Sequence, residues 1–111
     1  MRILRIAFIT IFALASVAGC LAEDGKALYR ANCKVCHDKG SPNKQYTPMT
    51  LTQEQWRRAF SGAQFQSAHR SAVHPGTGKK LLESLTPEQM KAIQRFAIDH
   101  AADSEQPATC G

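Results

Sequence analysis

Apolar residues recur at helical spacing in the segment "DGKALYRANCKVCH". Ala27, Leu28, Ala31 and Val35 fall on one helical face, and Asp24 stands where a helix N-cap is expected. The pattern predicts a first helix that starts near Asp24 and carries two cysteines towards its end. The next segment, "KGSPNKQYTP", is rich in Gly, Pro, Ser and Asn, and it therefore predicts a loop.

A second helix is expected over 53–60. Thr52 and Gln55 have the capping-box spacing, in which each side chain bonds the backbone N–H of the other residue. The segment that follows, "AQFQSAHRSAVHPGTGKKLLES", is interrupted by one proline and two glycines. We expect irregular chain there, with only a short helix near Leu81.

The last predicted helix has the same kind of start. Thr86 and Gln89 repeat the capping box, and Pro87 occupies the first turn, where proline is well tolerated. The helix should fade over 100–103. Its apolar face is expected to consist of Met90, Ile93, Ala97 and Ala101.

These elements contain no strand pattern and no repeat, so the sequence predicts a small all-α domain at 23–103 with a polar C-terminal tail at 104–111. A domain of this size buries a modest core and often needs a cofactor, a metal or disulfides for stability.

Residues 1–22 have the pattern of a secretory signal peptide. Arg2 and Arg5 precede a short apolar run and then small residues. The run is shorter than the roughly 20 residues that a membrane span needs. Two processing routes fit: cleavage after Ala22, or a lipoprotein signal in "VAGC" that ends before a lipid-bearing Cys20. The chain is therefore expected in a bacterial periplasm, either free or anchored to the envelope by lipid.

The charge balance is mildly basic. The full chain has 14 basic and 9 acidic residues, a net charge of +5. Loss of Arg2 and Arg5 with the signal leaves 12 basic and 9 acidic residues, or +3. The basic residues are scattered and do not alternate with aromatic ones, so we expect no nucleic-acid partner.

Cys33, Cys36 and His37 form the pattern C-x-x-C-H, the attachment motif of haem c. Within one helical turn, two thiols lie close enough to form thioethers with both vinyl groups of one porphyrin. We therefore expect Cys33 and Cys36 to hold one covalent haem c, with His37 as the proximal iron ligand. A thioredoxin-like dithiol would need a neighbouring strand, and a structural zinc site would need four ligands, so both alternatives fit less well.

Two helical segments make the chain resemble the class I monohaem c-type cytochromes. "GKALYRANCKVCH", with Gly25 and Tyr29, is similar to that family's first helix, and "SLTPEQMKAIQRFA", with Phe96, is similar to its last. The resemblance implies a cytochrome c-like fold in which these two helices cross and the chain wraps one haem. It also implies that the segment preceding Pro48 orients the proximal histidine through its Nδ1 proton.

The ligand on the other side of the iron is less clear in the sequence. The family usually places a methionine before the last helix, often followed by proline, whereas this chain has His74 followed by Pro75. His74 is therefore the first candidate, with His69 next, because imidazole suits iron. Met90 is a further alternative, although ligation would disturb the start of the last helix. Met49 is expected to pack beside the haem edge.

Two residues have open roles. The Trp56 indole could donate to a haem propionate or simply fill the core. Cys110 is left without an intramolecular partner, so it could form an intermolecular contact or be incidental.

The expected function is that of a single-electron carrier rather than an enzyme. Its partners would be redox proteins that dock transiently, and Lys34, Lys39 and Lys44 are candidate contacts for acidic partners. A membrane contact would arise only through a lipid on Cys20. The alternative is a haem enzyme or ligand-sensing haem protein with an open sixth iron position.

Overall fold

The computed structural model describes residues 24–108. The chain forms helices only: α1 (Gly25–Tyr29), one π-helical turn (Arg30–Lys34), one 3-10 turn (Pro48–Thr50), α2 (Gln53–Ser61), α3 (Ala63–His69), α4 (Leu81–Ser84) and α5 (Pro87–Asp99). No strand occurs in this range, and one isolated bridge joins Val73 to Lys80. The all-α prediction is confirmed.

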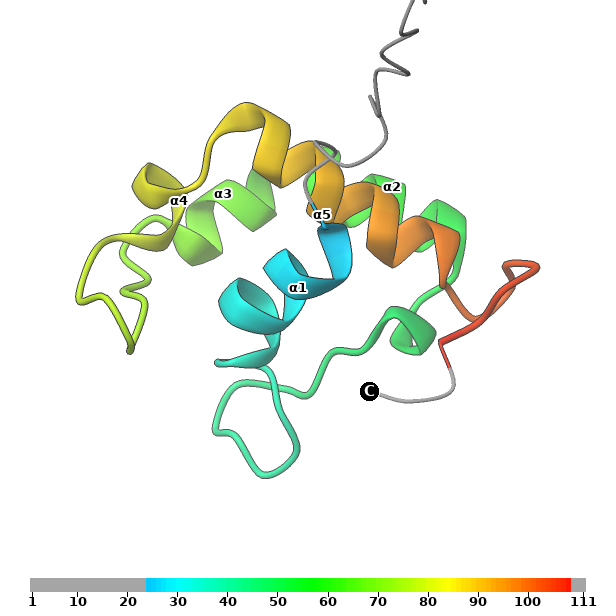
Figure 1. Ribbon diagram of the computed structural model, residues 1–111, viewed down its shortest axis with the longest axis horizontal. Coiled ribbons are helices and arrows are strands. Elements are labelled where there is room, and N and C mark those ends of the chain that lie inside the picture. Colours follow the sequence, from blue (N-terminus) through cyan, green and yellow to red (C-terminus); the bar gives the residue numbers. More distant parts are fainter. Residues whose placement is uncertain (1–23, 109–111) are drawn as a thin grey trace, which may run out of the picture.

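Helices α1 and α5 cross and hold the two ends of the domain together (Figure 1). Gly25 lies at this crossing, where the backbone of α1 approaches Ala92 and Phe96 so closely that a side chain would overlap them. Helix α2 packs on α5 as well. The core cluster lies where the three helices meet and consists of Tyr29, Trp56, Ile93, Ala97 and Ala101.

The predicted capping boxes form as expected. The Thr52 side chain accepts from the Gln55 N–H and the Gln55 side chain accepts from the Thr52 N–H, at 3.2 and 2.9 Å. Thr86 and Gln89 repeat this arrangement at 3.1 and 2.9 Å. The predictions for the second helix, the last helix and the short helix near Leu81 are confirmed.

The prediction of irregular chain after Gly62 is wrong, because Ala63–His69 forms helix α3. No side chain caps its start, since Gly62 occupies the N-cap position. Phe65 instead packs edge-on against Phe60 of α2, with ring centroids 5.4 Å apart. Contact with another helix therefore stabilises a segment that has no local start signal.

Residues 1–23 and 109–111 lie outside the described part, and so do the predictions for Cys20 and Cys110. Among residues 24–108, no helix has the length and apolar character needed to cross a membrane.

Candidate haem site

Cys33 lies in the π-helical turn that ends the first helical segment, and Cys36 lies in the turn that follows. The N–H groups of Cys36 and His37 both donate to the Cys33 carbonyl, at 3.1 and 3.0 Å. This turn places both thiols and the following imidazole within one short loop of backbone. The two cysteines are half-buried and unpaired.

The Cys33 thiol has the wrong acidity for a reactive dithiol. Burial raises its pKa to about 12, and the neighbouring Cys36 adds to the rise. Redox-active C-x-x-C motifs have a lowered pKa, because the thiolate is the reactive form. This raised pKa fits a haem attachment point better than a thiol-exchange centre.

His37 is held by the loop that follows it. Its Nδ1 lies 2.7 Å from the Lys44 carbonyl and donates to it, while the Tyr46 N–H donates to the His37 carbonyl at 3.0 Å. The Tyr46 ring packs edge-on against the imidazole, with centroids 5.2 Å apart. A proton fixed on Nδ1 leaves Nε2 as the metal-binding nitrogen.

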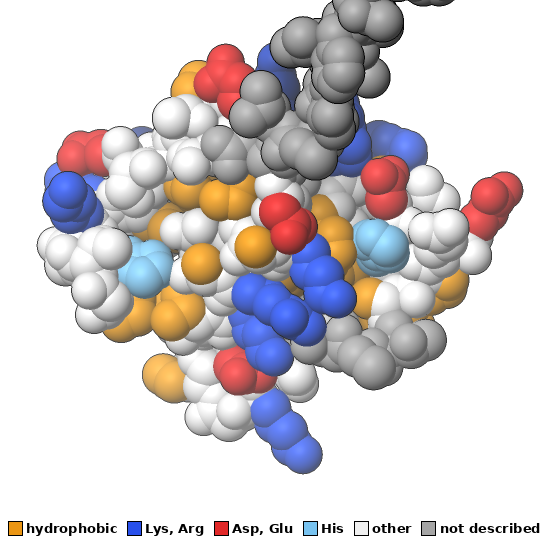
Figure 2. Space-filling model, viewed as in Figure 1, with side chains coloured by type: hydrophobic (Ala, Val, Ile, Leu, Met, Phe, Trp, Pro, Cys, Tyr) orange, Lys and Arg blue, Asp and Glu red, His pale blue; other side chains and the backbone are white. Residues whose placement is uncertain are grey.

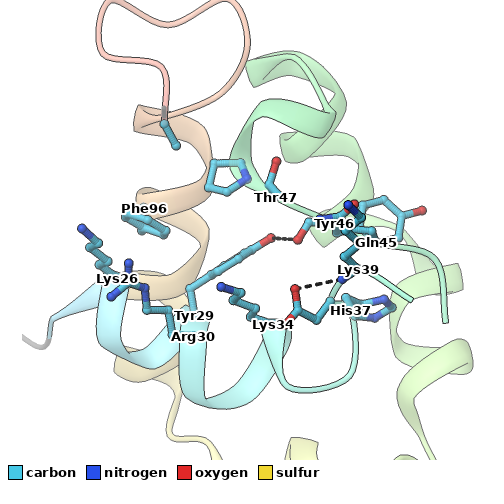
Figure 3. A pocket seen from close by; sticks show the side chains of 13 residues that line it. Lys26, Tyr29, Arg30, Lys34, His37, Lys39, Gln45, Tyr46, Thr47 and Phe96 are labelled. Atoms are coloured by element: carbon cyan, nitrogen blue, oxygen red, sulfur yellow. Dashed lines mark hydrogen bonds between the residues drawn. The ribbon is translucent and has the colours of Figure 1, made fainter. Parts of the chain in front are cut away.

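Tyr29 holds the loop that contains Lys44 and Tyr46. Its hydroxyl donates to the Tyr46 carbonyl at 2.9 Å (Figure 3). The ring is only 4% exposed and packs on Phe96 of α5, with centroids 5.5 Å apart. The crossing of α1 and α5 is thus connected to the loop that orients His37.

Pro48 and Trp56 form a second support. Pro48 is buried four residues after Lys44, and its carbonyl accepts the Trp56 indole N–H at 2.9 Å. Trp56 is 6% exposed and stacks on Phe60. An indole has one N–H, so in this arrangement Trp56 has no proton left for a propionate.

The candidate distal residues lie in different environments. His69, at the end of α3, lies near His37, with ring centroids 6.1 Å apart. His74 instead bonds the first helical segment, with Nε2 2.7 Å from the Ala31 carbonyl. Met90 lies in the first turn of α5, whose capping box is intact, and Met49 is 41% exposed.

A hollow of about 300 Å³ lies beside His37, between α1, loop residues 45–48 and α5. Figure 2 shows basic side chains clustered on one face of the molecule. Of the residues that line the hollow, Lys26, Arg30, Lys34 and Lys39 are basic (Figure 3). Asp38 is the acidic residue among its lining. The hollow reaches His37 but not the two cysteines or His69.

The family resemblance implied that the segment preceding Pro48 orients His37, but it did not indicate which residue of that segment supplies the acceptor, here the Lys44 carbonyl. Sequence reasoning missed the Tyr46 carbonyl, which accepts from the Tyr29 hydroxyl, because a carbonyl is common to every residue type. The hydroxyl of Tyr29 was the available signal, because a buried tyrosine usually finds a hydrogen-bond partner.

Comparison with known families agrees with this geometry. Residues 21–102 match the family model described as Cytochrome C oxidase, cbb3-type, subunit III. The match covers most of the chain, which therefore belongs to this family of class I monohaem c-type cytochromes. No curated protein and no solved structure gave a significant match.

Family membership implies one covalently bound haem c and a haem-based electron-transfer role with redox protein partners. The side chains fit such a group. Two unpaired thiols stand at the attachment spacing, and the adjacent imidazole has its Nδ1 fixed and its Nε2 available. Imidazole ligation at the iron tunes its redox potential.

Proposed function

We propose that the mature chain is an exported monohaem cytochrome that carries single electrons in the periplasm or envelope of a bacterium. Cys33 and Cys36 would form the two thioethers, and His37 would be the proximal ligand. The observation that carries the proposal is the 2.7 Å bond between His37 Nδ1 and the Lys44 carbonyl, directly after the two cysteines. Such a bond fixes the imidazole and raises its basicity as a ligand.

A rigid ligand suits electron transfer, because an iron whose surroundings change little between oxidation states exchanges electrons without a large rearrangement. The loop that positions His37 is bonded at Lys44 and Tyr46 and supported by Tyr29. The arrangement supports an electron carrier in which the protein holds the iron in one geometry and leaves one haem edge exposed to its partners.

Intact mass and redox titration of the exported protein test this proposal. We expect one haem that resists acid extraction and titrates reversibly as a one-electron couple. Cys33→Ala with Cys36→Ala should lose the covalent haem, whereas Cys110→Ala should keep it. A wild-type protein without a covalent haem would contradict the proposal, and a haem without a reversible couple would favour the enzyme or ligand-sensing alternative.

The same mass measurement separates the two processing routes. Cleavage after Ala22 gives a chain that starts at Glu23, whereas lipoprotein processing gives a chain that starts at Cys20 with added acyl groups. Only the second product should partition into detergent, and Cys20→Ala should abolish that partitioning. A product that retains residues 1–19 would contradict both routes.

Docking to partners is proposed to be brief and aided by charge. The basic side chains near His37 support acidic partners, because complementary charge speeds encounter without requiring a large interface. Lys34, Lys39 and Lys44 are the proposed contacts. Cys110 is a proposed intermolecular contact, for which a dimer band that disappears on reduction is the expected sign.

A further inference from the structure

We propose that His69 is the second axial ligand, opposite His37, and that His74 is a structural residue. This inference rests on the proposed haem attachment at Cys33 and Cys36. It assigns the sixth iron position to a helix that the sequence pattern did not predict, and it reverses the order of the two histidines expected from the loop before α5.

The separation of the two imidazoles suits a shared metal. A metal–imidazole bond of about 2 Å, with the ring centre about 1 Å behind the nitrogen, places two opposed ring centres about 6 Å apart. The centroids of His37 and His69 are 6.1 Å apart. The planes differ by 58°, which two opposed ligands accommodate because each ring can rotate about its own metal bond.

The two rings also have matching hydrogen bonds. Nδ1 of His37 lies 2.7 Å from the Lys44 carbonyl, and Nδ1 of His69 lies 2.7 Å from the Phe65 carbonyl. A carbonyl only accepts, so the proton of each neutral ring lies on Nδ1. Neither Nε2 has a hydrogen-bond partner among residues 24–108. Metal-binding histidines have this arrangement, with one nitrogen held by a carbonyl and the other free.

Aromatic packing holds His69 in place. Its ring lies 4.4 Å from that of Phe65, one helical turn earlier, and Phe65 contacts Phe60. Phe60 in turn stacks on Trp56, the buried centre of α2. This row of rings connects His69 to the core, so the packing of α2 and α3 fixes where the imidazole lies.

His74 uses both of its ring nitrogens in other contacts. Nδ1 accepts from the N–H groups of Gly76 and Thr77, at 2.9 and 3.2 Å. The proton therefore lies on Nε2, which donates to the Ala31 carbonyl at 2.7 Å. Iron ligation through either nitrogen would break at least one of these bonds. His74 instead joins the 73–80 loop to the helical segment that carries the cysteines.

Optical spectra of the exported holoprotein and matched variants test this assignment. The wild type should be low-spin and should lack the near-infrared sulfur-to-iron band of methionine ligation. His69→Gly should keep the covalent haem but become high-spin and bind carbon monoxide when reduced. Added imidazole should restore the low-spin spectrum, which a purely structural role for His69 would not allow. His74→Gly, the matched control, should stay low-spin.

The reduction potential gives an independent reading. His69→Met should raise it, because a thioether favours ferrous iron more than imidazole does. If the His69 variants fail to fold, wild-type protein with isotope-labelled histidine decides the question by NMR. Two imidazoles, His37 and His69, should show large paramagnetic shifts, and His74 should show none.

Several results would overturn the assignment while leaving the proposed haem attachment intact. These are a methionine band in the wild type, an unchanged low-spin spectrum and potential in His69→Gly, and a high-spin spectrum in His74→Gly. A high-spin wild type would also overturn it. A chain without covalent haem would instead contradict the proposed function on which the inference rests.

Discussion

Tyr29 connects the helix crossing to the haem site through a single hydroxyl. The ring is buried against Phe96, and the hydroxyl reaches the Tyr46 carbonyl in the loop that holds His37. The bond is partly buried, and a carbonyl left without its donor costs up to about 1–3 kcal/mol, with the smaller values where water can reach it. The contribution of Tyr29 therefore depends on its polar atom as well as on its apolar area.

Replacing Tyr29 by Phe should lower the free energy of unfolding by about 1–2 kcal/mol. The substitution keeps the ring and leaves the Tyr46 carbonyl without its donor. Urea unfolding of the haem-bearing protein measures the change. Tyr46→Phe is the matched control, because no hydrogen bond of the Tyr46 hydroxyl occurs in the described range and its carbonyl is retained. Equal losses in the two variants would contradict this account.

Burial of the Tyr29 phenol should also make the fold sensitive to alkali. Burial raises the pKa of Tyr29 above its ordinary value of 10.0. The folded state thus binds this proton more tightly than the unfolded chain does, so its contribution is complete below about pH 10 and declines above it. The range from about pH 8 to about pH 11 extends from roughly two pH units below the usual tyrosine pKa to roughly one above it. Over this range, the urea midpoint of unfolding should fall more in the wild type than in Tyr29→Phe. Parallel curves would contradict the expectation.

At the scale of whole elements, the crossing of α1 and α5 depends on the missing side chain of Gly25. A Cβ there would overlap the Ala92 carbonyl oxygen and lie 2.9 Å from the Phe96 Cβ. Both neighbours belong to α5, where a backbone atom cannot rotate away. The two helices can therefore approach this closely only if the position is glycine.

Gly25→Ala should destabilise the protein by about 1–3 kcal/mol, the usual cost of overpacking a close contact. Thermal unfolding followed by circular dichroism measures this loss. Lys26→Ala, at the next and exposed position of α1, should change stability by less than about 0.5 kcal/mol. A neutral or stabilising Gly25→Ala would mean that α1 can shift along α5 without loss.

The sequence predicted the helices that have capping residues at their own start. It missed helix α3, which depends on contact with another helix. Thr52 with Gln55 and Thr86 with Gln89 act within one turn, so their pattern is readable and α2 and α5 start as expected. Helix α3 has glycine at its N-cap, and it is held by the contact of Phe65 with Phe60. Such a contact exists only after α2 and α3 pack together.

The same distinction explains what was readable in the site. Cys33, Cys36 and His37 lie within five consecutive residues, so their spacing alone indicated haem attachment. The approach of His69 to His37 spans 32 residues and depends on α3, which the pattern did not predict. His74 was preferred for its place before a proline, whereas its hydrogen bonds to Ala31 and Gly76 follow from a turn that residue types do not specify.

At the scale of the whole molecule, few apolar side chains are fully buried, and several aromatic rings next to them are only half-buried. The buried apolar residues of the described range are Tyr29, Pro48, Trp56, Leu81, Ile93, Ala97 and Ala101. Tyr46, Phe60 and Phe65 are only partly buried, although Tyr46 packs against His37 and Phe65 packs against both His69 and Phe60. A haem attached at Cys33 and Cys36 would supply apolar surface for these rings to cover. The cofactor is therefore expected to complete the core as well as to carry the electron.

Chain produced without haem should accordingly fail to fold cooperatively. A domain of this size has little stability in reserve, and a bound group that is absent from the unfolded state adds its binding free energy to that of folding. We expect the haem-bearing protein to melt in one sharp transition by far-ultraviolet circular dichroism, and the haem-free chain to show reduced helix signal and a broad, gradual change. Haem-bearing Cys110→Ser serves as the control for handling and should melt like the wild type. A haem-free chain that melts sharply near the wild-type midpoint would show that the buried protein residues suffice, and that the aromatic rings around His37 and His69 need no cofactor to order them.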